Sequence, residues 1–86
     1  MRPKLRGWDI QLSETFKNEA ANGKIEKTYR FRCEKNNDDY HIVWITVCVC
    51  QKQLEFLYCE GEAPQKSLEK LKASIAKELE ATEELI

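Results

Sequence analysis

The stretch from His41 to Cys50 limits the fold of this chain more than any other feature. It reads HIVWITVCVC, which is rich in β-branched and aromatic residues and apolar at odd and even positions alike. A strand of this composition fits the middle of a sheet, where both of its faces are covered. The run is far too short to cross a bilayer as a helix, which takes about 20 residues. We therefore expect a central strand and no membrane-spanning segment.

Two stretches before it, residues 8–16 and 25–34, alternate between apolar and polar side chains. This period of two is typical of strands with one buried face. Glu14 falls on the apolar side of the first stretch, so we expect that strand to end or to bulge there. The polar connection between the two stretches contains Asn22-Gly23, which supplies the positive φ angles of a tight turn.

A fourth strand is predicted over residues 54–60, after a tight turn at Gln51-Lys52, and Gly61 then breaks the pattern. A helix is predicted over residues 64–84, since Pro64 suits a first helical turn and apolar residues recur at helical spacing. The fold class is therefore α+β: a four-stranded antiparallel meander with strands near 8–16, 25–34, 41–50 and 54–60, followed by one long C-terminal amphipathic helix packed on one face. Residues 1–86 form a single domain, with residues 1–6 as a basic N-terminal arm.

The predicted turn at Gln51-Lys52 assigns side chains to the two faces of the sheet. It pairs Cys50 with Gln53 and Trp44 with Cys59, and directly opposite residues share a face. The more apolar face, which we assign to the helix, holds Val43, Ile45, Val47, Val49, Leu54, Phe56 and Tyr58. The second face is too apolar for water and is expected to bind a second copy of the chain or another protein. Its predicted interface residues are Trp44, Cys48, Cys50, Leu57 and Cys59.

The four cysteines lie inside strand-like stretches, and no export signal precedes them. We therefore expect buried, reduced thiols and a cytoplasmic location. Cys48-x-Cys50 differs from the two-residue spacing usual at zinc sites, and His41 is the only histidine, so we expect no metal and no cofactor. His41 follows Asp38-Asp39, but a surface hairpin offers no pocket for a nucleophile and its base, so we expect no catalytic site.

Charge is spread unevenly along the chain. The net charge is −1; residues 1–32 contribute eight Lys/Arg against four Asp/Glu, and residues 33–86 contribute six against eleven. Basic side chains could neutralise phosphates while Trp44 stacks on an unpaired base. The candidates are Arg2, Lys4, Arg6, Arg30 and Arg32. The order of four strands and one helix is similar to that of the PC4-type single-stranded-DNA-binding proteins, which dimerise; this resemblance is of element order only, and fold does not fix function.

Three functions follow as hypotheses. The first is a non-enzymatic protein-interaction module, homodimeric or a subunit of a small complex, that uses the second apolar face of its sheet. The second is single-stranded nucleic-acid binding through a basic sheet face and the N-terminal arm. The third is an inhibitor protein encoded by a phage or a mobile element.

Overall fold

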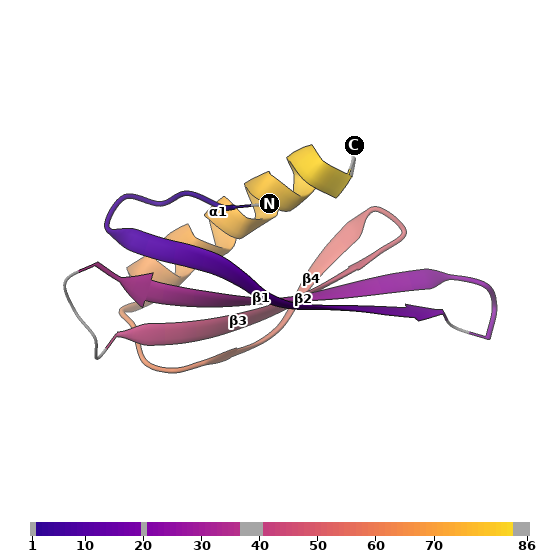
Figure 1. Cartoon of the computed structure of the whole chain (residues 1–86), viewed down its shortest axis with the longest axis horizontal. Helices are drawn as coiled ribbons and strands as arrows, with labels where there is room; N and C mark the ends of the chain where they lie inside the picture. Colours follow the sequence, from indigo (N-terminus) through magenta and orange to yellow (C-terminus); the bar gives the residue numbers. More distant parts are fainter. Residues whose placement is uncertain (1, 20, 37–40, 84–86) are drawn as a thin grey trace.

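The computed structural model describes residues 2–19, 21–36 and 41–83, in which the chain forms a four-stranded antiparallel sheet and a helix. Each strand pairs with the next along the chain, in the order β1–β2–β3–β4, so the predicted α+β meander is confirmed (Figure 1). The predicted helix end at residue 84 lies outside the described residues. The elements are β1 Trp8–Glu19, β2 Ile25–Lys35, β3 Ile42–Cys50, β4 Gln53–Glu60 and α1 Gln65–Glu83.

Strand β1 contains a β-bulge. Its register to β2 moves from Leu12↔Phe31 to Glu14↔Arg30, which leaves Ser13 as an extra residue. An extra residue in one strand bends that strand without ending it. Of the two expected outcomes near Glu14, the strand therefore bulges, and it then continues to Glu19 instead of ending near residue 16.

The turn between β3 and β4 is centred on Gln51 and Lys52, as predicted, and Cys50 pairs with Gln53. Both central residues have positive φ, 51° and 63°. Two successive positive φ angles define a type I′ turn, whose twist matches that of the flanking strands. This turn is built without the glycine or asparagine that usually supplies such angles.

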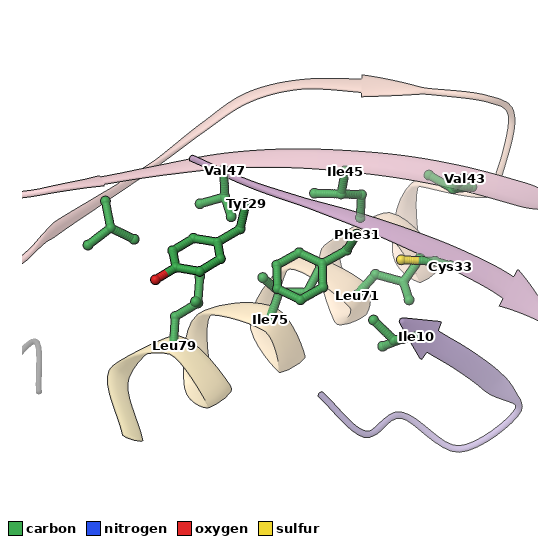
Figure 2. Packing of buried hydrophobic residues seen from close by; sticks show 11 residues of the cluster. Ile10, Tyr29, Phe31, Cys33, Val43, Ile45, Val47, Leu71, Ile75 and Leu79 are labelled. Atoms are coloured by element: carbon green, nitrogen blue, oxygen red, sulfur yellow. The ribbon is translucent and has the colours of Figure 1, made fainter. Parts of the chain in front are cut away.

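The core lies between α1 and one face of the sheet, here called the inner face. Figure 2 shows Leu71, Ile75 and Leu79 of α1 directed at side chains of β1, β2 and β3. All three are fully buried, because helical spacing places them on one stripe of α1. Their buried partners on the inner face are Ile10, Tyr29, Phe31, Cys33, Val43, Ile45, Val47 and Val49.

The N-terminal arm packs beside α1. Gly7, with a φ of 88°, allows the chain to reverse between Leu5 and Trp8, where the Trp8 amide donates to the Leu5 carbonyl at 3.0 Å. Pro3 is buried, and the Ser74 hydroxyl donates to the Lys4 carbonyl at 3.0 Å. The arm therefore belongs to the same side of the sheet as the helix.

Candidate functional site

The sheet face opposite α1, here called the outer face, is not covered by any element among the residues that the structure describes. The central strand β3 places Trp44, Thr46, Cys48 and Cys50 there, because they alternate with the buried residues of the inner face. Trp44, Cys48 and Cys50 are half-buried by their neighbours on the same face. Three of the five predicted interface residues thus lie on this face.

Strand β4 departs from the predicted register because it too contains a β-bulge. The pairs Phe56↔Val47 and Tyr58↔Thr46 follow one another, which leaves Leu57 as the extra residue. The predicted pairing of Trp44 with Cys59 is therefore wrong: Trp44 lies opposite Glu60, and Cys59 lies opposite Ile45.

The bulge exchanges two side chains between the faces. Cys59 packs against the core on the inner face, so it is not on the predicted interface. Tyr58, predicted on the helix side, is on the outer face and 51% exposed. Leu57, at the bulge itself, is 49% exposed. Strict alternation along β4 gives no sign of this exchange, since one extra residue reverses every later assignment.

The bulge in β1 moves a further aromatic residue to the outer face. After Ser13 the register places Phe16 opposite Thr28, which lies opposite Cys48. Phe16 is 50% exposed there, although its place in the alternation predicted the same side as Trp8 and Ile10. Glu14, an acidic residue on an apolar side, was the only signal in the sequence that could have located this bulge.

Arg30 crosses the centre of the outer face. It starts from β2, passes over β3 with its guanidinium carbon 4.6 Å from the centroid of the Trp44 ring, and reaches Glu60 on β4 with an N···O distance of 3.5 Å. The Nε atom of Arg30 and the hydroxyl of Thr46 are buried and have no hydrogen-bond partner among the residues that the structure describes. Arg30 and Trp44 thus form the centre of the face.

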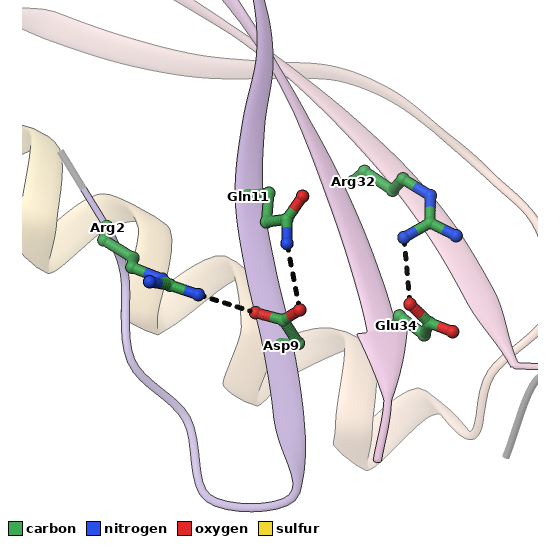
Figure 3. A network of polar contacts seen from close by, with 5 residues as sticks. All are labelled: Arg2, Asp9, Gln11, Arg32 and Glu34. Carbon is green, nitrogen blue, oxygen red and sulfur yellow. Dashed lines mark hydrogen bonds and ion pairs between the residues drawn. The ribbon is translucent and has the colours of Figure 1, made fainter. Parts of the chain in front are cut away.

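The second predicted arginine of this face is also paired. Arg32 donates to Glu34 on the same strand at 2.9 Å (Figure 3). Both arginines of the predicted nucleic-acid site therefore lie on one face, as their spacing implied, but each has a carboxylate partner. A phosphate would have to displace that carboxylate in order to bind.

The structure separates the basic arm from this arginine pair. The arm residues Lys4 and Arg2 contact α1, where the Arg2 amide donates to Glu78 at 3.3 Å. Only the Arg2 guanidinium reaches the outer side of β1, where it pairs with Asp9 at 3.3 Å (Figure 3). Arg2, Lys4 and Lys77 line a hollow of about 730 Å³ between the arm and α1, away from the outer face. Arg6 is exposed on the same arm.

The outer face is acidic. The strand registers place six carboxylates and two guanidinium groups on it, and the Arg2 guanidinium reaches it at Asp9, so these groups together carry a formal charge of −3. The six carboxylates are Asp9, Glu14, Glu26, Glu34, Glu55 and Glu60.

Three of the four cysteines have a raised thiol pKa, which disfavours the thiolate. Burial, with a smaller contribution from Cys59, raises the pKa of the Cys33 thiol to about 12. Burial and then the nearby Glu26 carboxylate raise the pKa of Cys48, and burial raises that of Cys59. All four thiols are free, and only Cys33 is fully buried, so the expectation that all four are buried is wrong for three of them. Nucleophilic chemistry needs a lowered thiol pKa.

A small hollow of about 290 Å³ lies at the Cys48–Cys50 end of the outer face. Its walls combine the two thiols and Gln53 with the carboxylates of Glu26 and Glu55. No cluster of three or more His, Cys, Asp or Glu side chains suited to a metal ion occurs in the described ranges. Asp38 and Asp39, which precede His41, lie outside those ranges.

Comparison of the chain with protein-family models, with curated proteins and with solved structures found no match. None of the described segments forms a helix with both the length and the apolar character needed to span a bilayer.

Proposed function

We propose that this protein is a non-enzymatic protein-binding module that binds its partner through the outer face of its sheet. The observation that carries the proposal is the uncovered row of Trp44, Thr46, Cys48 and Cys50 on the central strand, continued by the exposed Tyr58 of β4. Trp, Tyr and Arg are the residues most enriched at the energetic centres of protein interfaces. The outer face has one of each: Trp44 lies on β3, Arg30 stacks on it from β2, and Tyr58 of β4 lies opposite Thr46 of β3.

A partner that differs from the chain itself is better supported than a homodimer. Two outer faces brought together would oppose a formal charge of −3 to another of −3. Like charges placed opposite each other across an interface cost several kcal/mol, in rough terms. The protein therefore acts as a subunit of a hetero-complex. An intracellular location belongs to the same proposal, because four free thiols suit a reducing compartment.

The structural observations do not favour the nucleic-acid alternative. Phosphate binding draws on a surface of net positive charge. Arg30 and Arg32 instead stand among six carboxylates, and each already pairs with one of them. Nothing in the fold bears on the hypothesis of a phage or mobile-element inhibitor.

Site-specific photocrosslinking tests the proposal. A benzophenone amino acid replaces Tyr58 in the native host, and the matched control carries it at Lys66, an exposed residue of α1. We expect a protein adduct from position 58 and none of the same mass from position 66. Equal adducts from both positions, or none from position 58, would show that the outer face is not the binding surface.

A further inference from the structure

The backbone of the two central strands beneath the outer face is engaged in pairing with the neighbouring strands. Strands β2 and β3 are paired on both sides, so a partner segment lying across them meets side chains only. Such a segment must satisfy its own backbone groups, which an α-helix does and an isolated extended strand does not. We propose that the outer face binds a cationic amphipathic helix of a partner protein, an inference that rests on the proposed function.

The dimensions of the face fit one helix. The row from Trp44 to Cys50 spans about 20 Å at roughly 3.3 Å per residue. That length corresponds to about 13 residues of helix, or between three and four turns. The protein already uses this arrangement on its inner face, where α1 places Leu71, Ile75 and Leu79 over the same central strand (Figure 2). A helix on the outer face would complete a three-layered α/β/α unit.

The charges on both sides of the row define the polar flanks of that helix. Glu55 and Glu60 lie on β4 opposite Cys48 and Trp44, while Glu26 lies on β2 opposite Cys50. Glu26 and Glu55 take part in no salt bridge among the residues that the structure describes. A helix with an apolar stripe and lysine or arginine on both sides of it complements this pattern, whereas acidic flanks would be repelled.

The hollow between Glu26 and Glu55 indicates one further contact with the partner helix, a lysine side chain. Its thiol wall suits the aliphatic stem of a lysine, and its two carboxylates suit the ammonium group at the tip of that side chain. A lysine of the partner helix therefore inserts its side chain between Cys48 and Cys50, with the charge held between Glu26 and Glu55.

Fluorescence anisotropy with a defined probe tests this inference on the full chain. The probe is a fluorescein-labelled 14-residue amphipathic peptide of leucine and lysine, and its counterpart replaces every lysine with glutamate. We expect the Leu/Lys peptide to bind and the Leu/Glu peptide not to bind. The double variant Glu26→Gln/Glu55→Gln should weaken binding about tenfold, as expected for two partly exposed ion pairs.

The matched control is Glu69→Gln/Glu80→Gln, which removes the same charge from exposed positions on α1. It should leave the affinity unchanged, with circular dichroism confirming that both variants are folded. Bound peptide should also slow the alkylation of Cys48 and Cys50. Equal losses of affinity in the two double variants, or binding of both peptides, would show that general charge attraction accounts for the binding, and would overturn the inference. If the Leu/Lys peptide fails to bind while Tyr58 still crosslinks a protein, the proposed function stands and this inference fails.

Discussion

The guanidinium carbon of Arg30 lies 4.6 Å from the centroid of the Trp44 ring, so two of the largest side chains of the outer face cover each other. A cation over an aromatic face is attracted by the ring quadrupole, an effect of about 0.5–1 kcal/mol at exposed sites. No element of the described chain shields Trp44 on this side. In the free protein its ring is therefore protected from water by another residue of the same face.

Removal of Arg30 should expose this ring. In a Trp8→Phe background, where Trp44 is the remaining tryptophan, Arg30→Ala should shift the emission maximum to longer wavelength and increase quenching by acrylamide. Arg32→Ala is the control, because Arg32 pairs with Glu34 on its own strand. An Arg32 variant with the same shift, or an unshifted Arg30 variant, would contradict the contact.

The β3–β4 turn offers a stabilising substitution. Gln51 and Lys52 both hold positive φ angles, which are unfavourable for residues with a Cβ atom. Asn-Gly is the preferred pair for a type I′ turn. Gln51→Asn/Lys52→Gly should therefore raise the free energy of unfolding by about 1 kcal/mol, measured by urea titration. Gln53→Gly, at the adjacent position in β4, should lower the free energy of unfolding. An increase for this variant would point to a general effect of glycine rather than to the turn.

Gly61 should be the least replaceable glycine of the chain. Its φ is 106°, and a Cβ atom at this position would collide with the Ile42 carbonyl oxygen and lie 3.2 Å from the Cα of Val43. Gly23 has a φ of 81° but open space around it. We expect Gly23→Ala to cost about 1–2 kcal/mol through backbone strain and Gly61→Ala about 3 kcal/mol or more. Thermal unfolding of both variants measures the difference, and equal losses would contradict the steric clash.

Much of this fold follows from periodicity. Alternation located the strands to within a few residues, and the Gln51-Lys52 turn set the pairing of Cys50 with Gln53. The outer face was harder to predict, because the bulges at Ser13 and Leu57 each depend on one extra residue. Phe16, Tyr58 and Cys59 are therefore on the opposite face from the one that alternation assigned. The acidity of the outer face also depends on these registers, since it gathers carboxylates from all four strands.

The buried thiol of Cys33 should make stability depend on pH in alkaline solution. Burial raises its pKa from 9.0 to about 12, so the folded state holds the neutral thiol where the unfolded state ionises. The unfolded state then binds fewer protons between these values, and stability falls as the pH rises above 9.

The comparison of wild type with Cys33→Ala isolates this contribution, since the other titrating groups are common to both. Above pH 9 the wild type should lose up to about 1.4 kcal/mol more per pH unit than the variant, read from urea midpoints. A difference that stays constant from pH 8 to about 10.5 would show that Cys33 does not titrate in this way.

Deletion of Leu57 separates the bulge in β4 from the side chain that occupies it. Without this residue the pairs Phe56↔Val47 and Tyr58↔Thr46 become neighbours in a regular ladder, so each later residue keeps its face. The protein should therefore fold with Cys59 still packed against the core and slow to react with a thiol reagent. The edge of β4, however, becomes straight, and regular exposed edges pair with other chains.

We expect the deletion to cause concentration-dependent association, measured by light scattering. Leu57→Ala is the matched control, because it removes the apolar side chain and keeps the bulge; it should remain monomeric at the same concentrations. Association of the alanine variant alone would assign the effect to the side chain. A Cys59 that reacts as fast as Cys48 in the deletion variant would mean that the register shifts instead of closing. If the deletion variant associates and Leu57→Ala stays monomeric, the bulge protects the edge of the sheet from pairing. Partner binding would then involve the outer face rather than the edge of β4.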